Sequence, residues 1–230
     1  ALYASAGQSL NLNWKWEDIA KHLKINVRDS MSALDIKNNL LGVCDQMYLF
    51  EPGDDTTVCV LKAVKPKKVK LFTGPPSHKE DDAKVVHELM NNADIRIVSG
   101  GTTSQIVARE LGVEVKSSTE IYDKEVPPIA YIQGVDLVTE GVLTLSKTID
   151  RLKSLSKSLD SDIFKAKDGA SQMAKLLYSA SHIKLLVGRS LNIANAESSF
   201  QRDLELRLHV VGELEKILVK LGKIVTVEYY

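Results

Sequence analysis

Short apolar runs alternate with stretches of helical periodicity along most of this chain, and the alternation predicts its fold class. Apolar runs with the length and composition of β-strands are expected at 57–64, 69–72, 95–98, 113–115, 183–187 and 224–230. Apolar positions three and four residues apart predict helices at 14–23, 30–48, from Asp81 or Asp82, at 102–111, about 141–155, 170–180 and about 204–221. Strands separated by helices predict an α/β fold with a mostly parallel sheet flanked by helices.

Polar segments and prolines predict the connections between these elements. Residues 122–135 contain a Pro-Pro pair and predict a long, stiffened loop, and polar residues crowd 154–162. Residues 192–202 are also polar and are expected to form a loop. At 65–68 a β-type pattern ends, a proline enters and lysines cluster, which predicts a first domain at 1–64 and a second at 65–230.

A strand, a glycine turn and a helix are predicted across 94–112, and the turn is a candidate anion site. Thr102 and Gln105 have the spacing of a capping box that opens a helix. The first amides of a helix lack internal partners and lie at the positive end of its dipole, so an anion can be held there. The residues of this candidate ligand site are Gly100, Gly101, Thr102 and Thr103.

The same stretch also fits ordinary α/β construction. A capped helix after a glycine turn needs no ligand, and neither the third glycine of a dinucleotide motif nor the Gly-Lys-Thr of a P-loop follows. Both interpretations are open from the sequence.

Four further polar residues are candidates for the same ligand site. Loops after successive parallel strands meet at one edge of a sheet, so one crevice is expected to include Asp136, Thr139, Glu140 and Arg189. Each of these residues also has an ordinary structural interpretation that needs no ligand. The first three also fit a helix cap followed by an acid in the first turn, and Arg189 fits a surface ion pair.

Charge and cysteine usage narrow the range of partners. Thirty basic and thirty acidic residues cancel, so a nucleic-acid partner is not expected. No apolar run has transmembrane length and the first residues lack a signal-peptide pattern, so no membrane partner is expected. Cys44 and Cys59 lack metal or redox spacing and are expected to be buried free thiols, which indicates a cytoplasmic protein.

Two adjacent acids precede the first predicted strand. Asp54 and Asp55 lie in the turn before residue 57, where acidic residues are common. Their carboxylates also suit a hard cation such as Mg²⁺ or Mn²⁺, and two such ions can activate water for attack on phosphorus. A centre of that kind requires further carboxylates from other segments, and the sequence offers no second convincing group.

An ordered series of motifs resembles one family. EPGDDTTV at 51–58 is similar to the closing acidic motif of metal-dependent serine/threonine phosphatases of the type 2C class, in the sporulation stage II protein E group. Similarity to the C-terminal extension of such phosphatases runs through LFTGPP at 71–76, GGTT at 100–103, VPPI at 126–129 and GVDLVTEG at 134–141. The resemblance implies that Asp54, and less directly Asp55, binds Mn²⁺ or Mg²⁺ in a centre that hydrolyses phosphoserine or phosphothreonine of a phosphoprotein substrate.

The chain also departs from that family. The other acidic ligands would lie upstream, and an alanine stands in SAG at 5–7 where an aspartate is expected, so we expect an incomplete metal centre in a C-terminal portion. Our first hypothesis is such a phosphatase portion with a regulatory or ligand-binding α/β domain. The alternative is a non-catalytic α/β module for a phosphate- or carboxylate-bearing ligand. A third hypothesis is an interaction surface in which the amphipathic last helix covers a partner, and self-association into a homo-oligomer would be one form of it.

Overall fold

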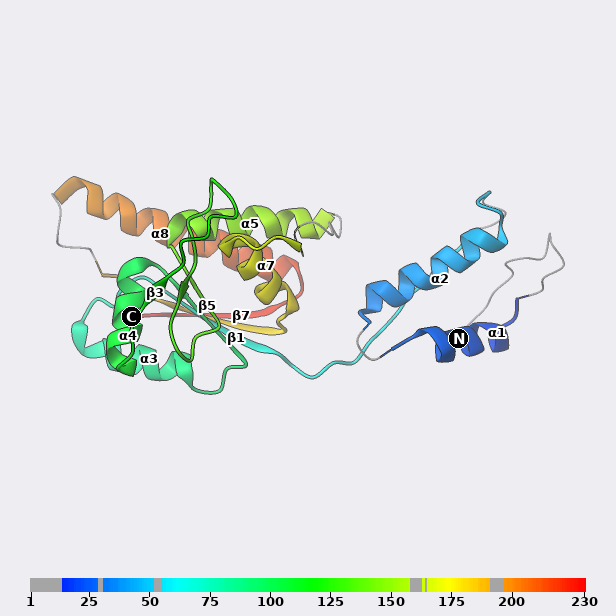
Figure 1. Cartoon of the computed structure of the whole chain (residues 1–230), viewed down its shortest axis with the longest axis horizontal. Coiled ribbons are helices and arrows are strands. Elements are labelled where there is room, and N and C mark those ends of the chain that lie inside the picture. The colour runs from blue at the N-terminus through cyan, green and yellow to red at the C-terminus, as the bar shows by residue number, and fades with distance from the viewer. Residues whose placement is uncertain (1–13, 29–30, 52–54, 158–162, 164, 191–196) are drawn as a thin grey trace. The chain divides into compact units, whose positions relative to one another are not determined.

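The chain forms two compact units, Ala1–Lys65 and Pro66–Tyr230 (Figure 1). The structure is a computed structural model that describes residues 14–28, 31–51, 55–157, 163, 165–190 and 197–230. In the second unit, helices cover both faces of a mostly parallel sheet, which confirms the predicted α/β fold. Among the described residues no helix is both long enough and apolar enough to cross a membrane.

A seven-stranded sheet in the order β3-β4-β5-β2-β1-β6-β7 forms the middle layer of the second unit. Its strands are β1 (Lys68–Thr73), β2 (Ile95–Ser99), β3 (Lys116–Ser117), β4 (Ala130–Tyr131), β5 (Leu137–Thr139), β6 (His182–Val187) and β7 (Ile224–Tyr229). Neighbours from β5 to β7 pair in parallel, whereas β3 and β4 pair antiparallel. Because the chain places later strands on both sides of β1, loops diverge at this strand, and ligand sites of doubly wound sheets lie at such carboxyl ends.

Helices α3 (Asp82–Met90) and α4 (Gly101–Leu111) lie on one face of the sheet, and α5 (Val142–Lys157), α7 (Gly169–Ser179) and α8 (Glu197–Lys220) lie on the other (Figure 1). Alternate residues of each strand point to opposite faces, so the sheet carries two cores. The core under α5, α7 and α8 includes Leu71, Ile97, Leu185, Leu145, Leu177 and Leu214. The core under α3 and α4 includes Phe72, Val98, Leu186, Val85, Leu89 and Val107.

The loops after β1 and β6 are packed directly against each other. A Cβ atom on Gly188 would lie 2.1 Å from the carbonyl oxygen of Pro75, so only glycine fits at this position. The amide of Gly188 donates to the carbonyl of Thr73 over 2.9 Å. This contact fills the space between the ends of β1 and β6.

A cluster of charged side chains lies in the same unit where α3 packs against the sheet. Lys70 is 8% exposed and its Nζ lies 2.6 Å from Oε1 of Glu88, which also accepts a hydrogen bond from Lys184. Lys184 in turn lies 2.6 Å from Glu228. The hydrogen bonds from Lys184 and then Lys70 lower the pKa of Glu88, because both favour its charged form.

The first unit contains two helices and a small apolar core. The helices are α1 (Trp16–Asn26) and α2 (Ala33–Met47), and Ser32 caps α2 by accepting a hydrogen bond from the amide of Asp35. The buried residues of the core are Trp14, Ile19, Leu40 and Cys44. Cys44 and Cys59 are both free, as predicted, but burial was predicted correctly only for Cys44. Cys59 is exposed, because it lies on the segment at 55–67 that forms no strand.

The strand predicted at 57–64 is wrong. Residues 55–67 form no strand, and no described strand of the first unit pairs with them. Val58 packs against the small core, whereas Leu61 is 94% exposed and Val64 is 68% exposed. The composition is that of a strand, but a strand also requires a neighbour for its backbone hydrogen bonds.

Short elements in the middle of the second unit also differ from expectation. The predicted strand at 113–115 is wrong, because the amide of Val113 bonds back to the carbonyl of Ala108 and completes the end of α4. The short strand β3 follows it. Strand β4 lies inside the predicted loop at 122–135, and β5 was not predicted because three residues are too few for a periodic signal.

Two predicted connections are partly helical. Residues 154–157 belong to α5, and 158–162 lie outside the described residues. Helix α8 begins at Glu197 rather than near 204, so the loop predicted at 192–202 is wrong over 197–202. Its remaining residues lie outside the described part of the chain.

Candidate functional site

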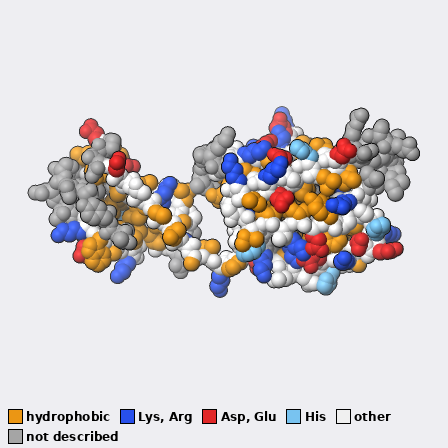
Figure 2. All heavy atoms as spheres, turned by 180° about the vertical axis from the view of Figure 1, so that it is seen from behind, with side chains coloured by type: hydrophobic (Ala, Val, Ile, Leu, Met, Phe, Trp, Pro, Cys, Tyr) orange, Lys and Arg blue, Asp and Glu red, His pale blue; other side chains and the backbone are white. Residues whose placement is uncertain are grey.

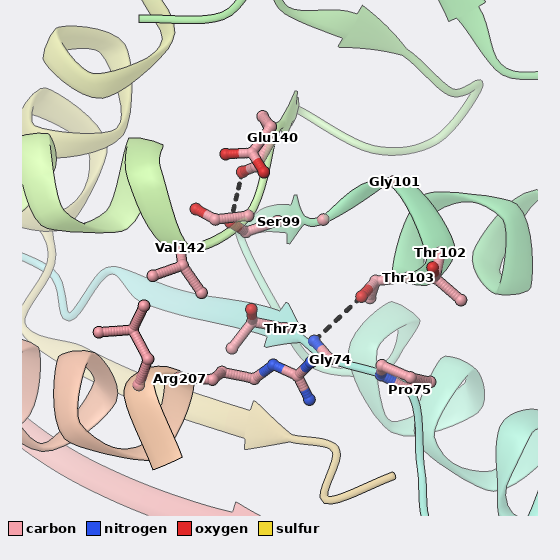
Figure 3. A pocket seen from close by; sticks show the side chains of 13 residues that line it. Thr73, Gly74, Pro75, Ser99, Gly101, Thr102, Thr103, Glu140, Val142 and Arg207 are labelled. Atoms are coloured by element: carbon pink, nitrogen blue, oxygen red, sulfur yellow. Dashed lines mark hydrogen bonds between the residues drawn. The ribbon is translucent and has the colours of Figure 1, made fainter. Parts of the chain in front are cut away.

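A cavity of about 300 Å³ lies at the carboxyl ends of β1, β2 and β5 (Figure 3). The loops after these three strands, the first turns of α4 and α5, and part of α8 form its wall. The lining residues are Thr73, Gly74, Pro75, Ser99, Gly100, Gly101, Thr102, Thr103, Glu140, Gly141, Val142, Leu206 and Arg207.

The turn between β2 and α4 presents free backbone amides to this cavity. Gly100 has φ 119°, which side chains rarely adopt, and α4 begins at the next residue. The first amide bonded within the turn is that of Ser104, which donates to the carbonyl of Gly100 over 2.9 Å. The N–H groups of residues 101–103 therefore have no partner inside the helix, and the first turn contains no acidic residue.

The predicted capping box at this helix is wrong. The N-cap is Gly100 and makes no side-chain cap hydrogen bond, and Thr102 lies inside the first turn with an exposed side chain. A Thr-x-x-Gln box requires the threonine at the N-cap, before the first helical residue. The helix starts at Gly101, two residues earlier than an N-cap at Thr102 would imply.

A second helix begins at the same cavity. The carbonyl of Gly141 accepts the amide of Leu145 over 3.1 Å, so the amides that precede Leu145 in α5 have no helical partner. The first turn of α5 also contains no acidic residue. Ser99 donates its hydroxyl to the carbonyl of Glu140 over 2.8 Å, which ties the loop before α5 to the end of β2 (Figure 3). The positive ends of two helix dipoles therefore border one cavity.

Two threonines line the cavity at its base. Thr103 is buried and its Oγ1 accepts the amide of Gly74 over 3.0 Å, which joins the loop after β1 to α4. Thr73 is 2% exposed as a whole residue and lines the cavity, so its hydroxyl can offer a ligand a donor and an acceptor.

Arg207 brings a cation to the cavity from α8. Its Nη1 donates to the carbonyl of Gly188 over 3.2 Å, and a Cβ on Gly74 would lie 2.6 Å from the same nitrogen. Gly74 is therefore needed for the guanidinium to lie against the loop after β1 (Figure 3). Arg207 was not predicted from the sequence, because it lies within a helical pattern, far along the chain from the strand-end motifs, and no local signal marks it.

Most of the residues predicted for the ligand site lie together. Gly100, Gly101, Thr102, Thr103 and Glu140 all line the cavity. Thr139 is 4% exposed and lies beside it: its carbonyl accepts the amide of Gly100, and its hydroxyl donates to the carbonyl of Glu140. Thr139 therefore supports the wall without lining it.

Two predicted residues lie elsewhere. Asp136 precedes β5, so it lies at the amino end of that strand, where its Oδ2 accepts the amide of Arg96 over 2.7 Å. The missed strand β5 is the reason, because it separates Asp136 from Glu140. Arg189 follows β6, but its guanidinium lies over the ring of Tyr229 at 4.4 Å from the centroid and does not line the cavity.

The predicted metal ligands belong to the first unit. Asp54 lies outside the described residues, and Asp55 is exposed on the extended segment after it. The described residues contain no group of three or more His, Cys, Asp or Glu side chains arranged to hold a metal ion. Mn²⁺ and Mg²⁺ take several oxygen ligands, and metal binding by Asp54 and Asp55 stays a prediction.

Charge on the second unit is mixed, in line with the balanced composition. Figure 2 shows basic and acidic side chains together over one face of this unit. Searches of protein-family models, curated proteins and solved structures found no match for this chain.

Proposed function

We propose that the second unit is a binding module for a small ligand that carries a phosphate or carboxylate group. The observation that carries this proposal is the convergence on one cavity of the amino ends of two helices, neither of which has an acidic residue in its first turn. Helix amino ends attract anions through their free amides and their dipoles. The cavity lies at the carboxyl edge of the sheet, where doubly wound folds bind ligands.

The lining indicates how a ligand would be oriented. The anionic group would meet the amides of residues 101–103, with the guanidinium of Arg207 as a further cation on the wall. Glu140 would accept a hydrogen bond from a hydroxyl or amine elsewhere on the ligand. The cavity volume of about 300 Å³ is near the lower limit for small-molecule sites, which favours a small metabolite over a macromolecule.

Thr102 provides a test in which stability and binding change in opposite directions. Its exposed side chain lies in the first turn of α4 and lines the cavity. Thr102→Glu adds a negative charge at the positive end of the helix and is expected to raise the free energy of unfolding by about 0.3–1 kcal/mol. The same charge repels an anionic ligand, whereas Thr102→Gln adds similar bulk without the charge.

The measurement is a thermal-shift and calorimetric screen of inorganic phosphate, phosphorylated metabolites and small carboxylates. We expect a ligand that stabilises the wild-type protein and Thr102→Gln but leaves Thr102→Glu unchanged. Retained binding in Thr102→Glu, or no response of the wild-type protein to any member of the panel, would refute the proposal.

We also propose that this module regulates a phosphatase of the family that the sequence resembles. The specific observation is that three segments of the resemblance, at 71–76, 100–103 and 134–141, each contribute residues to the one cavity. A serine/threonine phosphatase assay with Mn²⁺ is expected to give no turnover for this chain and measurable turnover for a longer chain with upstream aspartates. The ligand found in the screen should then alter the rate of the longer protein. An inactive longer protein would refute the catalytic part of the proposal and leave ligand binding intact.

A further inference from the structure

The two edges of the sheet in the second unit are built differently. At one edge, β3 (Lys116–Ser117) has two residues and carries a lysine, and both properties keep a sheet edge from pairing with another chain. At the other edge, β7 (Ile224–Tyr229) has six residues and contains neither lysine nor proline. The edge at β7 therefore lacks the protection that the edge at β3 has.

The hydrogen bonds at the two ends of β7 show which of its backbone groups face away from the sheet. The amide of Ile224 donates to the carbonyl of Ser181 over 2.9 Å, and that of Tyr230 donates to the carbonyl of Val187 over 2.9 Å. Bonding residues alternate along a strand, so the even-numbered residues of β7 direct their N–H and C=O groups towards β6. The odd-numbered residues direct theirs outward, and no backbone group in the described part of the chain bonds to them. These outward-facing residues are Val225, Val227 and Tyr229.

Apolar side chains of β7 are also incompletely covered. Ile224 is 58% exposed and Tyr229 is 45% exposed. Val225 and Val227 pack against the core under α5, α7 and α8 but are only partly buried. β-branched and aromatic residues are enriched in strands because they pack well against neighbours on a pleated surface. The edge thus offers apolar surface and free backbone groups together.

We propose that a second copy of this chain pairs with β7, antiparallel and across a twofold axis at Val227. In this register Val227 lies opposite Val227 of the second copy, and Val225 lies opposite Tyr229. Both residues of each pair face outward, so each pair exchanges two backbone hydrogen bonds. Ile224 lies opposite Tyr230 and loses much of its exposure. Cross-strand pairs of β-branched and aromatic residues stabilise a sheet, and the same edge serves both copies.

Charge and strand length select this register. Glu228 lies opposite Thr226 of the second copy and keeps its ion pair with Lys184 of its own copy, at 2.6 Å. An axis at Glu228 would set two carboxylates directly opposite each other, which is destabilising. An axis at Thr226 would place Tyr229 opposite Lys223, which precedes β7. Self-complementarity about one axis favours a second copy over an unrelated extended peptide as the occupant of this edge.

Analytical ultracentrifugation and amide hydrogen exchange over a range of protein concentrations test the dimer. We expect a monomer–dimer equilibrium in which the amides of Val225, Val227 and Tyr229 become protected as the concentration rises. The amides of Thr226 and Glu228 should be protected throughout, because they bond to β6. A protein that stays monomeric at the concentrations used for NMR would overturn the proposal. Protection that appears at residues 57–64 instead would also overturn it, because another strand would then form the interface.

Opposite charges at Thr226 test the register. Thr226 is the ladder partner of Lys184 within one copy, and it lies opposite Glu228 of the second copy. Thr226→Glu should therefore be tolerated in the monomer but should raise the dimer dissociation constant roughly threefold or more, because two such pairs change in each dimer. Thr226→Lys should lower that constant, although it places a second cation beside Lys184. Unchanged dissociation constants, or changes of the same sign in both variants, would overturn the assignment.

Val227→Pro tests the backbone hydrogen bonds. Proline removes the outward N–H, and edge strands tolerate proline where that group faces away from the sheet. The dimer dissociation constant should rise about tenfold or more while circular dichroism shows a retained fold. Unchanged dimerisation would overturn the proposal, and if this variant does not fold, the two Thr226 variants decide. Thr102→Glu should dimerise as the wild-type protein does, so this proposal and the proposed function fail independently.

Discussion

The two units differ in how completely their own residues bury their apolar side chains. In the second unit helices cover both faces of the sheet, and several core residues, including Leu71, Leu177 and Leu214, are fully buried. In the first unit the described core has four buried residues, while Trp16, Leu61 and Phe50 are 58%, 94% and 76% exposed. The second unit therefore buries its apolar side chains within itself, whereas the described part of the first unit leaves several large apolar side chains exposed.

The largest expected effect is on the core of the second unit. Leu71→Ala removes a side chain with 0% exposure from β1 and should lower the free energy of unfolding by about 2–5 kcal/mol. Leu40→Ala in the first unit should leave the main unfolding transition in place. Urea titration followed by circular dichroism measures both, with the exposed Val219→Ala as a control. An equal loss from Leu40→Ala would show that the two units unfold as one.

Glu88 provides the next test. Glu88→Gln leaves the buried ammonium of Lys70 without its carboxylate and should cost about 1–3 kcal/mol. The pKa of Glu88 is lowered, so its contribution is present above the unfolded value of about 4.3 and is lost as the pH falls through the folded value. The pKa of Lys184 is raised, chiefly by its hydrogen bonds to Glu228 and Glu88, so its contribution persists until the pH rises through the folded value.

Urea titrations of wild-type protein and Glu88→Gln across pH give the comparison. The difference should be largest near neutral pH and should shrink as the pH falls from about 4 through the lowered folded pKa of Glu88, below which the carboxyl group is protonated in both states. Glu213→Gln is the control, because its partner Lys216 is 78% exposed and exposed ion pairs contribute less than about 1 kcal/mol. A pH-independent cost for Glu88→Gln would contradict the assigned role of the charge.

A smaller effect of opposite sign is expected at helical glycines. Gly42 in α2 and Gly212 in α8 have no heavy atom within 4 Å of the position of an added Cβ. Gly212→Ala should raise the free energy of unfolding by about 0.5–1 kcal/mol, because alanine loses less backbone entropy than glycine when a helix forms. The midpoint of the main urea transition should rise accordingly. Gly42→Ala should not shift that transition, because it lies in the other unit.

The smallest effect is expected on the extended segment of the first unit. Leu61→Ser changes a side chain that is 94% exposed and should alter the free energy of unfolding by less than about 0.5 kcal/mol. Amide hydrogen exchange should find residues 55–65 unprotected, while amides of β1 and β6 exchange slowly. Slow exchange at 57–64 would indicate a paired strand there and would contradict the absence of a strand from this segment.

The sequence predicted those elements whose signals are local. Helical periodicity and apolar runs located β1, β2, β6, β7 and the helices that cover them within a few residues, apart from the beginning of α8, because burial of one face controls each pattern. The strand predicted at 57–64 does not form, because the composition of a segment does not show whether a neighbouring strand is present to accept and donate its backbone hydrogen bonds. The three residues of β5 carry too little pattern, and missing them misplaced Asp136.

The candidate site was predictable to the extent that its residues follow strands. Gly100 to Thr103 and Glu140 were found from turn chemistry and from the rule that loops meet at the carboxyl edge. Arg207 and Thr73 were not found, because one reaches the cavity from a distant helix and the other resembles any residue at the end of a strand. Tertiary packing alone brings these two side chains to the site.

Backbone amide NMR during titration with inorganic phosphate tests the central claim, ligand binding at the ends of β1, β2 and β5, most directly. The proposed function predicts that the largest shifts occur at the amides of Gly101, Thr102 and Val142, and that they disappear in Thr102→Glu. Absence of shifts at these amides, or shifts of equal size in Thr102→Glu, would contradict it.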